Sequence, residues 1–288
     1  MLRLPWFYPA ARRLKAMKRI YTWGAQPALR NVTLADLRAG KGNRKFTQVK
    51  VSIEDEAAAA AESDIDMIVC TSPTVDAVRR GNNTNFLTAT IAFQNFPTET
   101  DVLREAFRVL TLGADAILTP RNLDIVTMLA KEDIPVMGHL GLVPRKSTWT
   151  GGLRAVGKTA KEAIALFDKI RQLEDAGAAL VEVEVVPGPV MAEISKRTGL
   201  ITISLGSGSG ADVMYLFMED LTGENPDPPR HARAFGDLAR LQKQIQEERI
   251  NAITAFQQAA SNGQFPGADE TVSIEPAELE SFLMKLDQ

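Results

Sequence analysis

Short apolar runs alternate with helical patterns along the chain from about residue 46 onward. Eight runs have the length and content of buried strands: Phe46–Ser52, Asp66–Cys70, Phe86–Phe93, Ala114–Thr119, Ile134–Met137, Ala179–Val185, Leu200–Leu205 and Val213–Phe217. Helical patterns fill most of the gaps, at Glu54–Ser63, Thr74–Arg80, Glu99–Leu112, Leu123–Glu132, Thr159–Ala176 and Pro189–Arg197. This alternation predicts a parallel sheet with crossover helices. Eight such units close most economically as a (β/α)8 TIM barrel, with an open doubly wound sheet as the alternative.

The segments outside this barrel core, residues 46–222, have different patterns. Residues 1–45 precede the first strand and are expected to form an N-terminal arm. GENPDPPR, Gly223–Arg230, contains three prolines and predicts an exposed loop. One long helix from His231 to about Ala260 and a short helix near Pro276 follow it. We expect residues 223–288 to pack on the barrel or on a partner subunit, which favours a homo-oligomer.

Composition narrows the possible partners. The chain has 33 Lys and Arg against 36 Asp and Glu, a net charge of -3, and no basic stripe of the kind that binds nucleic acid. Because no apolar run is long enough to cross a bilayer, we expect no membrane partner. A lone cysteine, Cys70, cannot form an internal disulfide, and the N-terminus lacks the pattern of a signal peptide. A cytoplasmic protein that binds a small molecule is therefore expected.

Two polar residues lie where a barrel places its chemistry, at the C-terminal ends of the strands. His139 follows the fifth predicted strand, and Glu184 ends the sixth, within VEVEVVPGP. A carboxylate between valines must be solvated, paired or used, because burying an unpaired charge is costly. Alternation puts Glu182 on the same face of the strand as Glu184. Both candidates have structural alternatives: a salt bridge across the barrel for Glu184, and a hydrogen-bonded structural role for His139.

Several motifs resemble the ketopantoate hydroxymethyltransferase family. They are GHLGLVP at 138–144, GG-x-R-x-x-G at 151–157, LEDAGAALVEVEVVP at 173–187 and ISLGSG at 203–208. The resemblance extends from about Phe46 to Gly223. It implies a (β/α)8 barrel of the phosphoenolpyruvate mutase and isocitrate lyase superfamily, usually oligomeric, acting on 2-oxo acids. Family members transfer a hydroxymethyl group from methylenetetrahydrofolate to 3-methyl-2-oxobutanoate. They use a magnesium ion that binds the oxo acid and a glutamate that takes the C3 proton.

Carried over to this chain, the resemblance assigns the catalytic positions to Glu184, the proton-abstracting base, and to His139. It also shows a departure, because the two aspartates that bind magnesium in the family correspond here to Thr71 and Thr90. The neighbouring Ser72 is retained, but the family's K-x-E is replaced by residues 118–120, Leu-Thr-Pro. A threonine hydroxyl is a poor ligand for a hard divalent cation. We therefore predict no metal ligands, and expect magnesium and methylenetetrahydrofolate only if the family activity is retained.

Without a metal, positive charge must come from side chains. Arg121, directly after the fourth strand, and Arg154, in the glycine-rich loop, are candidates to bind an anionic substrate. With Thr71, Ser72 and Thr90 they form the predicted substrate-binding set.

Three hypotheses follow. The favoured one is a divergent enzyme that makes or breaks a carbon–carbon bond, or moves a proton, beside the carbonyl of a small 2-oxo acid, with Glu184 as base. The second is a genuine magnesium-dependent ketopantoate hydroxymethyltransferase. The third is a barrel without catalysis that binds a metabolite or serves in an assembly.

Overall fold

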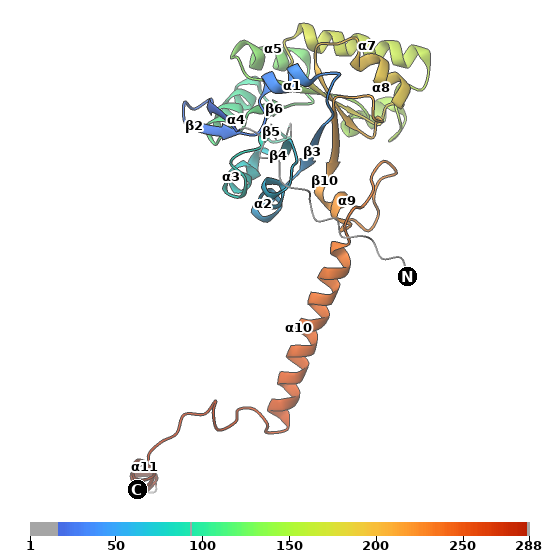
Figure 1. Ribbon diagram of the computed structural model, residues 1–288. Helices are drawn as coiled ribbons and strands as arrows, with labels where there is room; N and C mark the ends of the chain where they lie inside the picture. The colour runs from blue at the N-terminus through green and yellow to red at the C-terminus, as the bar shows by residue number, and fades with distance from the viewer. Residues whose placement is uncertain (1–16, 93, 287–288) are drawn as a thin grey trace.

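The computed structural model describes residues 17–92 and 94–286, and its core is a closed barrel of eight parallel strands (Figure 1). Around the barrel the strands follow the order β10-β3-β4-β5-β6-β7-β8-β9. Their bounds are β3 Phe46–Lys50, β4 Met67–Thr71, β5 Phe86–Thr90, β6 Ala116–Leu118, β7 Val136–Gly141, β8 Leu180–Glu184, β9 Ile201–Leu205 and β10 Val213–Phe217. The predicted (β/α)8 barrel is confirmed, and the open sheet is wrong because β10 pairs with β3 and closes the ring.

Helices follow the strands and form the outer layer of the barrel (Figure 1). The principal ones are α2 Glu54–Glu62, α3 Val75–Gly81, α4 Glu99–Thr111, α5 Leu123–Lys131, α7 Ala160–Asp175 and α8 Gly188–Ser195. Shorter helical pieces are η1 Ser72–Thr74, η2 Pro144–Lys146, α6 Ser147–Thr150 and α9 Met218–Thr222. Side-chain caps start several of them; for example, the Thr98 hydroxyl accepts a hydrogen bond from the Asp101 backbone N–H at the start of α4.

Side chains alternate between the inside of the barrel and the helical layer, as the two-residue period of a strand requires. Phe46, Met67, Met137 and Ile203 belong to the buried cluster inside the barrel, whereas residues such as Leu87 belong to the cluster between strands and helices. The strand β7 runs to Gly141, four residues past its predicted end, because His139 pairs with Glu182 of β8 and Gly141 with Glu184. His139 thus lies within a strand rather than after one.

Residues 17–45 are more regular than an arm. They form a hairpin of β1 Lys18–Tyr21 and β2 Pro27–Arg30, followed by α1 Leu34–Gly40. Leu37 of α1 is fully buried in the cluster inside the barrel. The Lys41 ammonium donates to the Leu200 carbonyl at 2.8 Å, just before β9, so this segment closes the N-terminal end of the barrel. Residues 1–16 of the expected arm lie outside the described residues.

The C-terminal helices do not pack on their own barrel. The helix α10, Leu238–Ser261, projects away from it, and α11, Pro276–Leu286, lies beyond its far end (Figure 1). The long helix begins at Leu238 rather than at His231, because residues 223–237 fold back as a loop whose Phe235 N–H donates to the Leu221 carbonyl at 2.8 Å. Among the described residues, no helix has the length and apolar character needed to cross a membrane.

Candidate active site at the barrel mouth

Three titratable side chains meet at the C-terminal end of the barrel: His139 from β7 and Glu182 and Glu184 from β8. The register pairs His139 with Glu182, and all three face the barrel interior. The Nε2 atom of His139 lies 3.0 Å from Oε2 of Glu184 and 3.6 Å from Oε1 of Glu182. In the described part of the chain the ionic partner of Glu184 is thus this histidine, and not the lysine or arginine considered from the sequence.

Burial and mutual charge shift the protonation of this triad. Burial lowers the pKa of His139, but the hydrogen bond with Glu184 and the charges of both glutamates outweigh it, so the net pKa is raised. Burial raises the pKa of Glu182, and the neighbouring Glu184 raises it further against the opposing effect of His139. The favoured state is a protonated imidazole facing two carboxyl groups, of which the deeper, Glu182, retains its proton more readily than usual. In such a state His139 is a hydrogen-bond donor that faces both carboxyl groups.

A cavity of about 520 Å³ lies over this side of the mouth, and Glu184 forms part of its wall. The loop after β7, the C-terminal ends of β8, β9 and β10, and the helix α9 line it, together with the loop of residues 223–237. Its lining includes the apolar residues Leu142, Leu153, Leu205 and Phe217 and the charged residues Arg154, Glu219, Asp220 and Arg230. An apolar wall with a few converging charges is typical of a small-molecule site.

Backbone strain marks the residue after Glu184. Val185 has a φ of 49°, in the left-handed region that a β-branched residue rarely adopts. Its N–H donates to the Leu205 carbonyl at 2.8 Å, and its own carbonyl accepts from Val156 at 3.3 Å, so both neighbouring segments hold it in place. Residues with strain of this kind cluster at active sites and ligand-binding sites.

The predicted threonines come together, but away from this cavity. Thr71 and Thr90 are paired across β4 and β5, and the Thr71 hydroxyl lies 3.4 Å from that of Thr74. In the strand order β4 stands opposite β8, and neither threonine is among the described residues that line the cavity.

The other predicted substrate-binding residues have different surroundings. Ser72 is fully buried, and its carbonyl accepts from Arg108 of α4, so it belongs to the layer between barrel and helices. The Arg121 guanidinium donates to the carbonyls of Phe96 and Pro97 at 3.0 Å each, which ties down the loop after β5. Arg154 alone of the five predicted residues lines the cavity, and its charge is paired with Glu162 at 2.8 Å.

The residues at the family's metal positions do not fit a magnesium ion. Thr71 and Thr90 offer neutral hydroxyls, and a hard divalent cation is normally held by carboxylates. A different set, His139, Glu182 and Glu184, has one nitrogen and two oxygens within 4.8 Å of one another. Imidazole and carboxylate ligands suit a transition metal or zinc better than magnesium.

The sequence prediction missed the part of the site that comes from residues 223–237. Proline content indicated an exposed loop, yet Asn225, Pro229, Arg230 and His231 all line the cavity. The Asn225 amide donates to the Asp220 carboxylate at 2.7 Å, which fixes the start of the loop beside α9. The chain's second histidine, beside the prolines, was the available clue.

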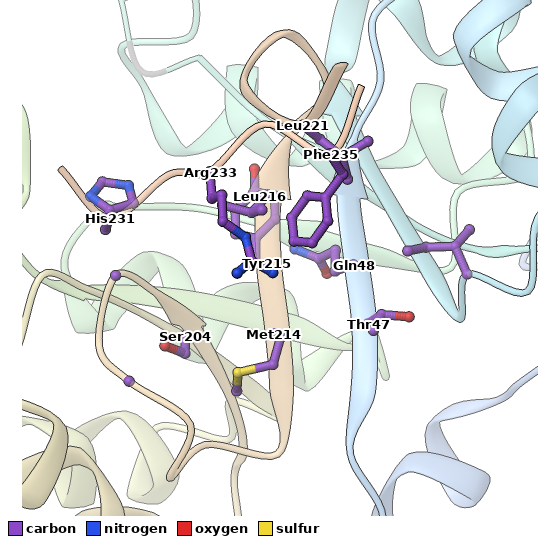
Figure 2. A pocket seen from close by; sticks show the side chains of 13 residues that line it. Thr47, Gln48, Ser204, Met214, Tyr215, Leu216, Leu221, His231, Arg233 and Phe235 are labelled. Carbon is purple, nitrogen blue, oxygen red and sulfur yellow. The ribbon is translucent and has the colours of Figure 1, made fainter. Parts of the chain in front are cut away.

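The same loop also covers a second, mostly apolar pocket of about 410 Å³ on the outside of β10 and β3. Figure 2 shows His231, Arg233 and Phe235 of the loop standing over Met214, Tyr215 and Leu216 of β10. His231 lines both pockets. Gly206, with a φ of 71°, leaves space for it, since a Cβ there would lie 2.7 Å from the imidazole ring.

The chain is similar to several known proteins. A 3-methyl-2-oxobutanoate hydroxymethyltransferase from Kosmotoga olearia is 30% identical over 255 residues, which cover 80% of this chain and 93% of that protein. One of the same name from Nitratidesulfovibrio vulgaris is 28% identical over 292 residues, covering 90% and 91%. A solved structure of 2,3-dimethylmalate lyase, a PEP mutase/isocitrate lyase superfamily member, has a TM-score of 0.45 at 13% identity, over 89% of this chain and 98% of that one. The family model for ketopantoate hydroxymethyltransferase matches residues 49–268. The chain therefore belongs to the ketopantoate hydroxymethyltransferase family.

Proposed function

We propose that this chain is a divergent enzyme of its family, in which Glu184 removes a proton from the carbon next to the carbonyl of a small 2-oxo acid. The contact of 3.0 Å between Glu184 Oε2 and His139 Nε2 carries the proposal. This contact orients the Glu184 carboxylate at the wall of a cavity that is large enough for a small acid. A general base has to lie within hydrogen-bonding reach of the proton that it removes, and a carboxylate on the cavity wall can meet this requirement. The resulting carbanion either takes a proton back from solvent or adds to an electrophilic carbon and forms a carbon–carbon bond. In the reverse direction, cleavage of such a bond releases the same carbanion, which the protonated Glu184 then reprotonates.

The enolate that forms needs stabilisation by a nearby donor or charge. His139 is suited to this, because its raised pKa favours the imidazolium and Nε2–H is the group that faces Glu184. As Glu184 takes the substrate proton, it loses its charge and its hold on Nε2–H weakens. The imidazolium is then free to donate to the developing oxyanion. No step in this scheme uses the magnesium ion of the family, whose ligand positions are Thr71 and Thr90.

The second candidate is a genuine metal-dependent ketopantoate hydroxymethyltransferase. The family match over residues 49–268 and the names of the relatives favour it. A divalent ion held by His139, Glu182 and Glu184 would occupy the carboxylate that the first scheme uses as a base. The two candidates therefore make opposite predictions about metal removal.

Proton NMR in D2O tests the proposal, with 3-methyl-2-oxobutanoate and a panel of 2-oxo acids, once with magnesium and once with EDTA. We expect exchange of the proton next to the carbonyl in both conditions. Glu184→Gln should reduce the rate of exchange by about 100- to 10,000-fold, which is the usual contribution of a general base. Glu193→Gln, an exposed carboxylate on α8, is the matched control and should leave the rate unchanged.

Three other outcomes contradict the proposal. Exchange that requires magnesium supports the family reaction, which should then also depend on methylenetetrahydrofolate. If exchange in EDTA persists in Glu184→Gln, Glu184 is not the base. Absence of exchange with every acid favours a barrel that binds a metabolite or serves in an assembly.

A further inference from the structure

The cavity beside Glu184 contains one cation that the described residues leave without a charged partner. Glu184 is paired with His139, and Glu219 lies 3.5 Å from the Lys50 ammonium. Asp220 accepts a hydrogen bond from Asn225, and Arg154 is paired with Glu162. The remaining charge on the wall is the guanidinium of Arg230, which has no ion pair or hydrogen bond within residues 17–92 and 94–286.

The surroundings of Arg230 hold its backbone in place at the edge of the cavity. The loop closes on itself at its base, where Phe235 N–H donates to the Leu221 carbonyl, and turns at its tip, where Ala232 N–H donates to the Pro229 carbonyl at 2.8 Å. Pro229, whose ring fixes its own φ, precedes Arg230 and stiffens the chain that leads to it. His231, the next residue, packs against Gly206 of the loop after β9. Arg230 is thus anchored on both sides, while its side chain faces the cavity.

A 2-oxo acid presents a carboxylate, and its binding requires positive charge. The family's metal supplies that charge at positions that are neutral here, Thr71 and Thr90, so the charge has to come from the cavity wall. An arginine meets a carboxylate with two parallel N–H donors, and the pairing is strongest when no protein carboxylate competes for it. Arg154 is less suited to this pairing, because the Glu162 carboxylate already binds its guanidinium.

We propose that Arg230 binds the carboxylate of the substrate in the cavity beside Glu184. This rests on the proposed function for the identity of the substrate, a small 2-oxo acid. Residues 223–237 are then a part of the substrate site, and Arg230 determines the preference of the site for acids over neutral carbonyl compounds.

Deuterium exchange of a 2-oxo acid and of its methyl ester tests this, because the ester keeps the carbonyl and the acidic C–H but lacks the charge. For Arg230→Gln we expect kcat/KM for the acid to fall by about 10- to 100-fold, mainly through KM, with little change for the ester. Arg230→Lys should recover part of the loss. Arg233→Gln is the matched control, since Arg233 lies in the same loop with its guanidinium 4.5 Å from the Phe235 ring centroid.

Calorimetric titration with oxalate, a stable dianion of similar shape to the enolate of a 2-oxo acid, gives a readout without turnover. We expect oxalate to bind the wild type and to bind Arg230→Gln at least about 10-fold more weakly. This result supports the anion site even if no 2-oxo acid exchanges its proton. In that case only the proposed function fails. Equal exchange of the acid by wild type and Arg230→Gln overturns the role of Arg230 while the proposed function stands. Equal losses for acid and ester also overturn it, because they indicate a general effect on the loop.

Discussion

At the scale of single residues, the two glutamates on β8 have different surroundings because one lies deeper than the other. Glu182 is 6% exposed and next to Tyr215, whose pKa is raised well above its usual value by burial and by the nearby carboxylates. Glu184, two residues further along β8, lines the cavity. Separation of two carboxyl groups into unlike environments is a common way to separate their protonation states.

The raised pKa values of Glu182 and His139 predict that stability falls as pH rises. Each group binds its proton more tightly in the folded protein than in the unfolded chain, so the stabilisation is complete below the unfolded value and is lost as pH rises through the folded one. The loss therefore starts above about 4.5 for Glu182 and above about 6.5 for His139. Urea denaturation between pH 4 and 8 should show that Glu182→Gln gains stability relative to the wild type as pH increases, by up to about 1.4 kcal/mol per pH unit.

Glu247→Gln, on the exposed face of α10, is the control for that measurement and should run parallel to the wild type. A constant difference between wild type and Glu182→Gln across the pH range would contradict the raised pKa of Glu182.

Spacing in the sequence predicted Glu184 and His139 at the barrel mouth, since a strand of known direction fixes which residue stands at its end. It could not decide the orientation of Ser72, which lies one residue beyond β4 and turns to the helical layer. Arg121 has a long side chain, and its place depends on the carbonyls of residues 96 and 97, which a sequence does not locate. Long flexible cations are therefore the least predictable members of such a site.

At the scale of elements, the eight strands were predictable because their apolar runs are distinct from the helical patterns between them. The hairpin β1–β2 was missed, since KRIY and PALR are four-residue strands that are mostly exposed and show little alternation. The start of α10 was placed too early because the helical spacing of apolar residues extends back to Phe235, while the loop's contacts with Leu221 determine its actual conformation.

The hairpin is joined to the barrel through a buried cluster of charges that should dominate its stability. Asp115 accepts from Arg30 at 2.8 Å and from Arg79 at 2.8 Å, and it also accepts from the Leu87 backbone. Burial lowers the pKa of Arg79 to about 10, even though Asp115 opposes this effect. Asp115→Ala leaves two buried guanidinium groups without a counter-charge, and we expect a loss of about 3–5 kcal/mol in the free energy of unfolding.

Chemical denaturation measures that loss, and Asp76→Ala, which removes an exposed partner of Arg80, is the control with an expected change below about 1 kcal/mol. Similar small changes in both variants would show that the buried cluster does not hold the hairpin.

At the scale of the whole molecule, α10 has an apolar stripe that the described residues leave largely exposed. Leu241, Ile245, Ile253 and Phe256 are all exposed and share one side of the helix. Met214 and Leu216 of β10 line the pocket in Figure 2, and none of the described residues that line it belongs to α10 or α11. A second copy of the chain offers both a matching stripe and a matching pocket, so we propose a homo-oligomer assembled through α10.

Light scattering after size-exclusion chromatography should give a mass that is a multiple of 31.4 kDa for the wild type. The double variant Ile245→Glu with Phe256→Glu should shift to the monomer, because it places charges in the stripe. Gln244→Glu with Asn251→Glu adds the same charge to the opposite side and should leave the mass unchanged. A monomeric wild type contradicts the assembly.

The loop that carries Arg230 runs directly into α10, with the Gln242 amide of that helix bonded to Glu224 at the loop's start. A partner subunit that holds α10 in place therefore also restricts the loop. Binding of the ligand then has a smaller entropic cost, because the loop is already ordered. Assembly and anion binding are then linked by mass action: the affinity for the anion rises with the concentration of the protein, and the ligand in turn resists dissociation on dilution.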